Sequence, residues 1–245
     1  MPSESTIATG LSTLVLALTF LVGGRVRPMR RMVRDEGRLL GLSAGISIAY
    51  VFVHMMPEIA AARETYASSV KIPVIFRGIL VYIVAMFGFM VYYGLDSVRM
   101  RLPARVDGRE SSLNFGIHVG GFAVYVWMIT DLLVNRLEKT SLSVALYTVA
   151  MIAHFLTIDH SLFTQHKVLY ERAGRQLLAA MCVLGWVSGL LIPLPLYLLA
   201  LMVAFISGAI IMNSAIMELP HREEQRFLAF IAGGVLYAAL LAPLG

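Results

Sequence analysis

Long apolar runs alternate with short, arginine-rich segments along the whole chain. Eight of these runs have about the 17–25 residues that an α-helix needs to cross the hydrocarbon core of a bilayer. The pattern predicts an all-α membrane protein of eight transmembrane helices, folded as a single domain over residues 1–245. The predicted spans are Ile7–Gly23, Leu39–Ala60, Ile72–Leu95, Leu113–Val134, Ser141–Gln165, Leu177–Ile192, Leu194–Met217 and Phe227–Leu244.

The composition agrees with a membrane location. Hydrophobic residues make up 58% of the chain and charged residues 14%, whereas soluble domains rarely exceed about half apolar residues. The first run follows MPSESTIATG, which carries no basic residue, so we expect a true span there and not a cleaved signal peptide. Because only Pro193 to Pro195 separate the sixth and seventh runs, we expect a tight helical hairpin at that point.

Basic residues set the predicted orientation, because cytoplasmic loops carry an excess of Lys and Arg. Fifteen lie in or beside the loops that follow the odd-numbered spans, against four, Arg63, Lys71, Arg136 and Lys139, in the other loops. The odd loops are therefore predicted to be cytoplasmic, with both termini outside a bacterial-type inner membrane. The net charge of +5 then lies beside anionic lipid headgroups, which favours membrane lipid as a partner and not nucleic acid.

Polar residues on the second span recur at steps of four, three, four and four. Such steps return to one helix face, so this seam is predicted to face the bundle interior, with Ala44, Val51 and Met55 more peripheral. Pro57 adds a break in the helical hydrogen bonding. The seam is either an interhelical hydrogen-bond contact or part of an ion pathway, and it comprises Ser43, Ser47, Tyr50, His54 and Glu58.

The fifth span is the most polar, since it holds three histidines and an aspartate. Imidazole and carboxylate together suit zinc, iron or manganese, or else a proton relay. His154 lies in mid-span and is the strongest candidate ligand. Asp159 and His160 are candidates as well, with a cytoplasmic-side polar cap as the alternative. His166 is expected to be interfacial.

Spans four and seven add three ionisable candidates, His118, Asp131 and Glu218. Ionisable groups in hydrocarbon are costly and therefore mark functional positions. Two of them have simpler explanations: Asp131 as the end of a helix near the outer interface, and Glu218 as a solvated side chain. The glycines of span four are expected to permit close helix packing; they are Gly116, Gly120 and Gly121.

Three stretches resemble the ZIP (Zrt/Irt-like) metal transporters. The second span, GLSAGISIAYVFVHMMPE, is similar to the second span of that family, with a histidine shortly before Pro-Glu. FISGAIIMNSAIMELP resembles its seventh span and FIAGGVLYAALL its eighth. The resemblance implies a ZIP-like bundle with both termini outside, the layout that the arginine distribution also predicts.

The metal-binding motifs of that family are altered here. The resemblance implies a two-metal site built from His-Asn-x-x-Asp-Gly on span four and His-Glu-x-x-His/Glu on span five. On span five His154 fits, but Phe155 and Ile158 stand at ligand positions. On span four, one register keeps Asp131 and puts Trp127 at the histidine position, whereas the other keeps His118 and puts Phe122 at the acidic position. The usual binuclear centre is therefore expected to be absent, and a remodelled site to remain.

The leading hypothesis is transport or sensing of a divalent metal ion. His54 and Glu58 would attract the ion from outside, His154 and Asp131 would bind it midway, and the cytoplasmic exit would be lined by Asp159, His160 and Glu218. The alternative is a non-transporting ZIP-fold subunit or receptor, with a homodimer or another membrane protein as partner. A third hypothesis is a haem or redox protein that uses a pair such as His54 and His154. We expect no enzymatic activity, because the chain lacks a nucleophile constellation, a phosphate loop and a cofactor fingerprint.

Overall fold

A computed structural model describes residues 4–22, 36–70, 78–101, 105–106, 109–135, 141–216 and 224–241. Within these ranges the chain is helical apart from the turn at 192–195, a few residues at helix ends and one short hairpin, in which β1 (Arg105–Val106) pairs antiparallel with β2 (Arg109–Glu110). This confirms the predicted helical class. The helical elements are α1 (Glu4–Val22), α3 (Glu36–Tyr50), η2 (Val51–Met55), α4 (Met56–Ser69), α6 (Ile79–Arg101), α7 (Ser112–Asn135), α8 (Ser141–Leu169), η3 (Tyr170–Gly174), α9 (Arg175–Leu191), α10 (Leu196–Ile216) and α11 (Glu224–Leu241).

The described residues contain the helices of a multi-pass membrane protein. Six helices are long and apolar enough to cross a membrane, and a shorter apolar helix covers Phe227–Leu241. One of the six runs from Leu142 to Leu191 and covers nearly all of the predicted fifth and sixth spans. It bends around Lys167, whose backbone angles (φ 11°, ψ −86°) are not helical, and around the π-helical turn η3. Eight separate spans remain a prediction.

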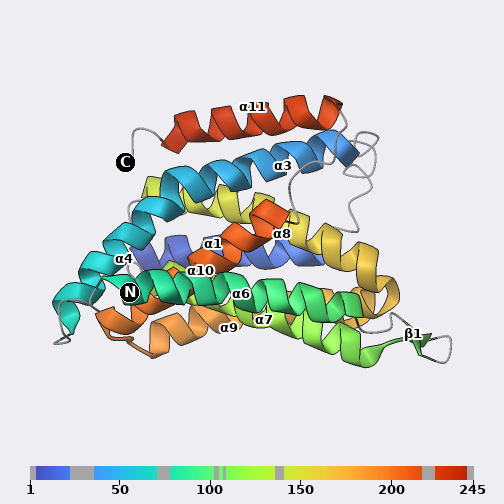
Figure 1. Cartoon of the computed structure of the whole chain (residues 1–245), viewed down its shortest axis with the longest axis horizontal. Helices are drawn as coiled ribbons and strands as arrows, with labels where there is room; N and C mark the ends of the chain where they lie inside the picture. Colours follow the sequence, from blue (N-terminus) through green and yellow to red (C-terminus); the bar gives the residue numbers. More distant parts are fainter. Residues whose placement is uncertain are drawn as a thin grey trace.

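The helical segments run back and forth between the two ends of an elongated bundle (Figure 1). Because of the bend at η3, α8 and α9 run in opposite directions. The β1–β2 hairpin and η3 lie at one end, whereas the start of α1, the end of α4, the α9–α10 turn and the end of α11 lie at the other. The two described loops that we predict to be cytoplasmic therefore share one end of the molecule.

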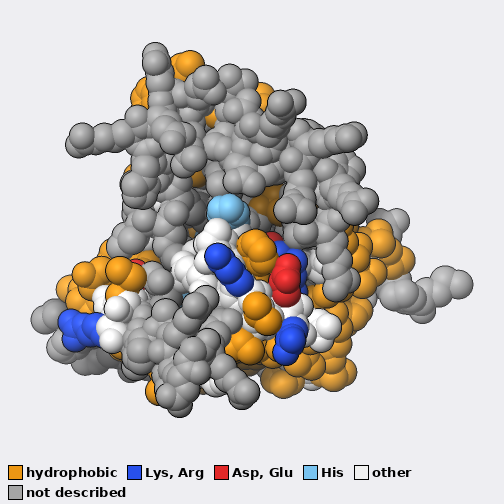
Figure 2. Space-filling view, turned by 90° about the vertical axis from the view of Figure 1, so that its right-hand side faces the viewer, with side chains coloured by type: hydrophobic (Ala, Val, Ile, Leu, Met, Phe, Trp, Pro, Cys, Tyr) orange, Lys and Arg blue, Asp and Glu red, His pale blue; other side chains and the backbone are white. Residues whose placement is uncertain are grey.

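That end is polar, as a membrane–water boundary requires. Figure 2 looks onto it and shows described basic, acidic and histidine side chains near its middle, with hydrophobic side chains towards the sides. The bend itself exposes Lys167, Glu171 and Arg172. The flanks of the bundle are apolar instead, since Phe87 and Met90 of α6 are more than half exposed.

Glycines bring two pairs of helices into backbone contact. A Cβ atom added at Gly45 of α3 would overlap the Phe230 carbonyl oxygen of α11, and one added at Gly208 of α10 would overlap the Ala85 carbonyl oxygen of α6. Small residues are the usual means of close helix approach in lipid. The glycines of span four were predicted to play this part, but Gly116 and Gly120 have open space around them. That prediction is wrong for these two positions.

Candidate functional site

His154 lies at the centre of the bundle and is fully buried in the middle of α8. Its Nε2 is 2.6 Å from the Tyr125 hydroxyl of α7, and its Nδ1 is 3.3 Å from the Ser47 hydroxyl of α3. Ser47 in turn is 2.9 Å from the Ser214 hydroxyl of α10. One imidazole thus joins four helices through uncharged groups. We call Ser47, Tyr125, His154 and Ser214 the His154 layer.

The seam on the second span reaches this layer from one end of the bundle. Ser43, Ser47 and Tyr50 are buried, as predicted. Farther along, the side chains of His54 and Glu58 are 33% and 31% exposed and lie 3.6 Å apart. The ring centroids of Tyr50 and His54 are 5.0 Å apart, so Tyr50 links the half-exposed pair to the buried part of the seam.

The helix is irregular where the seam passes from buried to half-exposed. His54 lies in η2, a π-helical turn in which the Met56 N–H donates to the Val51 carbonyl oxygen. Pro57 follows in the first turn of α4, where its missing N–H is tolerated. Single π turns inside α-helices are frequent at functional sites. His54 is therefore held on an interruption of the helix.

The other face of the second span is also buried, which corrects one expectation. Ala44, Val51 and Met55 were predicted to be peripheral, but they are 0%, 2% and 4% exposed. The cause is packing on more than one side. The Ser207 hydroxyl of α10 is 3.4 Å from the Met55 sulfur, while α11 covers another face of α3. The exposed side is Phe52 and its neighbours.

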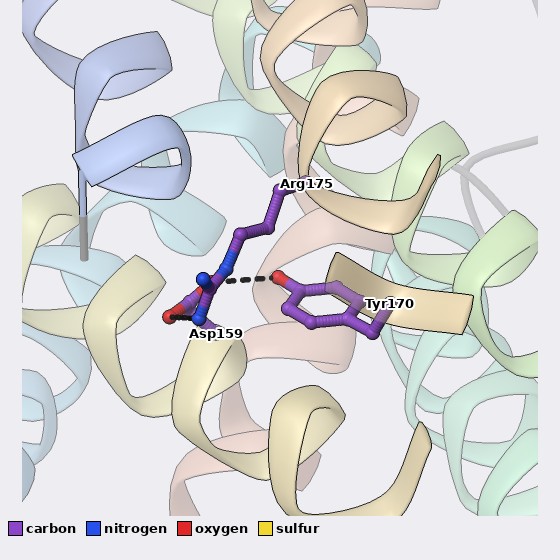
Figure 3. A network of polar contacts seen from close by, with 3 residues as sticks. All are labelled: Asp159, Tyr170 and Arg175. Carbon is purple, nitrogen blue, oxygen red and sulfur yellow. Dashed lines mark hydrogen bonds and ion pairs between the residues drawn. The ribbon is translucent and has the colours of Figure 1, made fainter. Parts of the chain in front are cut away.

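Asp159 lies five residues beyond His154 and belongs to a separate, charged cluster (Figure 3). The Tyr170 hydroxyl donates to its Oδ1 at 2.8 Å, and Arg175 donates from Nε to Oδ1 at 3.1 Å and from Nη2 to Oδ2 at 3.3 Å. The Arg175 guanidinium also lies over the rings of Phe163 and Tyr170. All three residues of this Asp159 cluster are buried. Because they come from α8, η3 and α9, the cluster ties both sides of the bend together.

Asp131 is held by a third set of contacts, between α7 and α9. Ser188 donates to its Oδ2 at 2.7 Å, Asn135 donates to its Oδ1 at 3.1 Å, and Trp127 donates to the Ser188 hydroxyl at 3.0 Å. These partners differ from those of His154. The predicted pairing of Asp131 with His154 is therefore not visible in the hydrogen bonds of either residue.

The remaining candidates are dispersed. His118 and His166 form a buried pair, with Nδ1 of the first 3.0 Å from Nε2 of the second; His166, which we expect at the membrane interface, directly precedes the bend at Lys167. His160 is exposed, which is consistent with the polar-cap alternative. Glu218 lies outside the described residues. Among the residues described, no three His, Cys, Asp or Glu side chains gather in a way that could hold a metal ion.

No family model, curated protein or solved structure matches the chain. The ZIP resemblance therefore rests on the short sequence stretches given above.

Sequence reasoning missed several residues of these clusters. Tyr170 and Ser188 carried no signal in the sequence, and Arg175 was counted only as a positive charge in a cytoplasmic loop. Tyr125 was visible as a polar residue within span four, but nothing in the helix periodicity indicated that it would contact His154. A tyrosine and a histidine at mid-depth of two apolar spans are the only hint that the sequence offers.

Proposed function

We propose that this protein is a ZIP-like protein of a bacterial-type inner membrane that moves or senses a divalent cation, with His154 as the central ligand. The supporting observation is the junction of α3, α7, α8 and α10 at one buried imidazole. Two of these helices correspond to the spans that resemble the ZIP family, the second and the seventh. They supply Ser47 and Ser214.

His54 and Glu58 form the outer mouth in this proposal. A half-exposed imidazole and carboxylate 3.6 Å apart offer a cation one nitrogen and one oxygen ligand. Ser47 lies seven residues before His54 on the same helix, which corresponds to about 10 Å along the axis. The cation would pass along this seam towards His154, and a rocking of helix groups would complete transport. That motion is an analogy with the resembled family.

The test is binding and uptake of Zn²⁺ and Mn²⁺. Binding is measured on purified protein by equilibrium dialysis with elemental analysis, and uptake is measured in proteoliposomes. His154→Ala should weaken binding by at least about 10-fold, because even the loss of groups that merely orient a ligand costs about 10–100-fold. His160→Ala is the matched control, since it removes an exposed histidine from the same helix. Tight binding that ignores His154→Ala would contradict the proposal.

A second candidate is the non-transporting subunit or receptor. It is favoured by the residues that stand at two expected ligand positions. These residues, Phe155 and Ile158, are 0% and 4% exposed and belong to the main hydrophobic core. In addition, the carboxylates of Asp131 and Asp159 already have partners. If the wild-type protein binds neither metal at micromolar concentration, this candidate replaces the first.

A further inference from the structure

Asn213 of α10 is the most unusual polar residue near the His154 layer. It is 1% exposed, and neither its amide nitrogen nor its amide oxygen has a hydrogen-bond partner among the described residues. Buried amides are nearly always satisfied, and an exception calls for a physical explanation such as a bound ion or water. Inside an apolar bundle no bulk water is at hand to satisfy it.

The position of Asn213 connects it with the layer. It directly precedes Ser214, so their Cα atoms are about 3.8 Å apart, and Ser214 reaches His154 through Ser47. On the helix it shares a face with Ile206 and Ile210, which are 3% and 2% exposed and belong to the main core. Asn213 therefore sits in the interior of the bundle, close to the plane of the His154 layer.

The two ring nitrogens of His154 differ in the length of their contacts with hydroxyl groups. The contact of Nε2 with Tyr125 is short, at 2.6 Å, whereas the contact of Nδ1 with Ser47 is long, at 3.3 Å. Metal-bound histidines usually donate their second N–H to an oxygen, which fixes the tautomer. In the tautomer that carries its proton on Nε2, the lone pair of Nδ1 is directed towards Ser47 and hence towards α3 and α10, not towards the Asp131 cluster.

We propose that the cation site lies between α8, α3 and α10, and that the carboxamide oxygen of Asn213 is one of its ligands. The site rests on the proposed function, because a cation must first bind at His154. Its ligands are the His154 imidazole, the Asn213 oxygen and the hydroxyls of Ser47 and Ser214. One nitrogen ligand with neutral oxygen ligands suits Mn²⁺, Fe²⁺ or Zn²⁺. Cu⁺ prefers sulfur ligands, and the only cysteine of the chain, Cys182, is buried in α9, which does not contribute to this site.

The absence of a carboxylate from this ligand set has a consequence for affinity. A divalent ion held by neutral groups keeps its full charge in a poorly solvated environment, which is unfavourable. The affinity is therefore lower than a site with a carboxylate would have, and a single added negative charge should raise it. At Asn213, two substitutions of similar size are therefore expected to change metal affinity in opposite directions.

The test compares Asn213→Leu and Asn213→Asp by equilibrium dialysis with Mn²⁺ and Zn²⁺. Asn213→Leu should weaken binding by at least about 10-fold and leave thermal stability unchanged or higher, because an unsatisfied buried amide disappears. Asn213→Asp should bind at least about 10-fold more tightly. Thr13→Val is the matched control, since Thr13 is also buried with an unpartnered oxygen; it should not change binding.

The outcomes separate this site from the proposed function. If the wild-type protein binds no metal, both the Asn213 site and the proposed function are contradicted. If the wild type binds and His154→Ala loses binding, but Asn213→Leu binds as tightly as wild type, only the role of Asn213 is overturned. If Asn213→Leu fails to fold, Asn213→Asp decides: tighter binding supports the ligand role, and binding that is unchanged or weaker overturns it.

Discussion

Helix α8 carries two buried polar clusters five residues apart, and they differ in charge and in the polar group that lies beside them. In the Asp159 cluster a carboxylate receives three hydrogen bonds, two of them from one guanidinium, so its charge is neutralised in place. In the His154 layer the contacts join an imidazole with hydroxyl groups, and Asn213 next to it has no partner among the described residues. Both carboxylate oxygens of Asp159 are occupied by donors, whereas the amide oxygen of Asn213 has no described donor and can serve as a ligand.

The locations of the clusters agree with this difference. The Asp159 cluster spans the bend from α8 through η3 to α9, where the fold needs a fixed angle between two helices. The His154 layer lies where four helices meet and where the seam from His54 and Glu58 arrives. We therefore assign the Asp159 cluster to structure, and the His154 layer to the proposed function. The following predictions test that division, from the largest expected effect to the smallest.

Arg175→Leu should be the most damaging single substitution. It leaves the Asp159 carboxylate buried without its counter-charge, and breaking a buried ion pair in this way costs about 3–5 kcal/mol. The measurement is the free energy of unfolding in detergent. Arg172→Leu, at an exposed position of the same bend, should stay within about 0.5 kcal/mol of wild type. If Arg175→Leu is as stable as the wild type, the Asp159 cluster does not have the structural role assigned to it.

The double variant Asp159→Asn/Arg175→Met should recover most of that loss. Replacing both members of a buried ion pair is often close to neutral, and the amide oxygen of the substituted side chain would still accept from Tyr170. We expect a stability within about 2 kcal/mol of wild type and unchanged Mn²⁺ binding. Loss of metal binding in this folded variant would mean that the two clusters are not functionally separate.

Tyr125→Phe should affect the His154 layer with little effect on the fold. Without the hydroxyl, Nε2 of His154 loses its contact with Tyr125, so affinity for Mn²⁺ should fall about 10–100-fold while stability falls by about 1 kcal/mol. Tyr147→Phe is the control, because the Tyr147 hydroxyl donates to the Ile129 carbonyl oxygen, away from His154. If both variants lose affinity equally, Tyr125 does not orient the ligand.

The helices of this protein could be predicted because the sequence leaves few choices. In lipid, every backbone N–H and C=O must be satisfied within the chain, so an apolar run of about 20 residues forms a helix. Each predicted span accordingly overlaps a helix within the described ranges, although α4, α6 and α8 run past the predicted ends. The buried part of the seam on the second span was also predictable, because steps of three and four residues fix a helix face.

The contacts between helices could not be predicted in the same way. Arg175 belongs to a basic segment beside the predicted cytoplasmic boundary, yet it is 6% exposed because the chain bends between Lys167 and Gly174 and turns it towards Asp159. His166 is buried for a related reason, since α7 supplies His118 opposite it. Such contacts depend on the three-dimensional path of the chain, and the sequence contains no proline at this bend.

The smallest effects are expected from single cysteines at exposed positions, which test where the two clusters lie in the membrane. Glu171→Cys at the bend should react with an impermeant maleimide only from the cytoplasmic side, and Ser69→Cys at the end of α4 only from outside. Both positions are exposed, so stability should change by less than about 0.5 kcal/mol. The native Cys182 is fully buried and should give little background. Labelling of Ser69→Cys only from the cytoplasm would invert the predicted orientation. The His54–Glu58 pair would then lie towards the cytoplasm and the Asp159 cluster towards the outside, so the proposed seam would receive its cation from the other side.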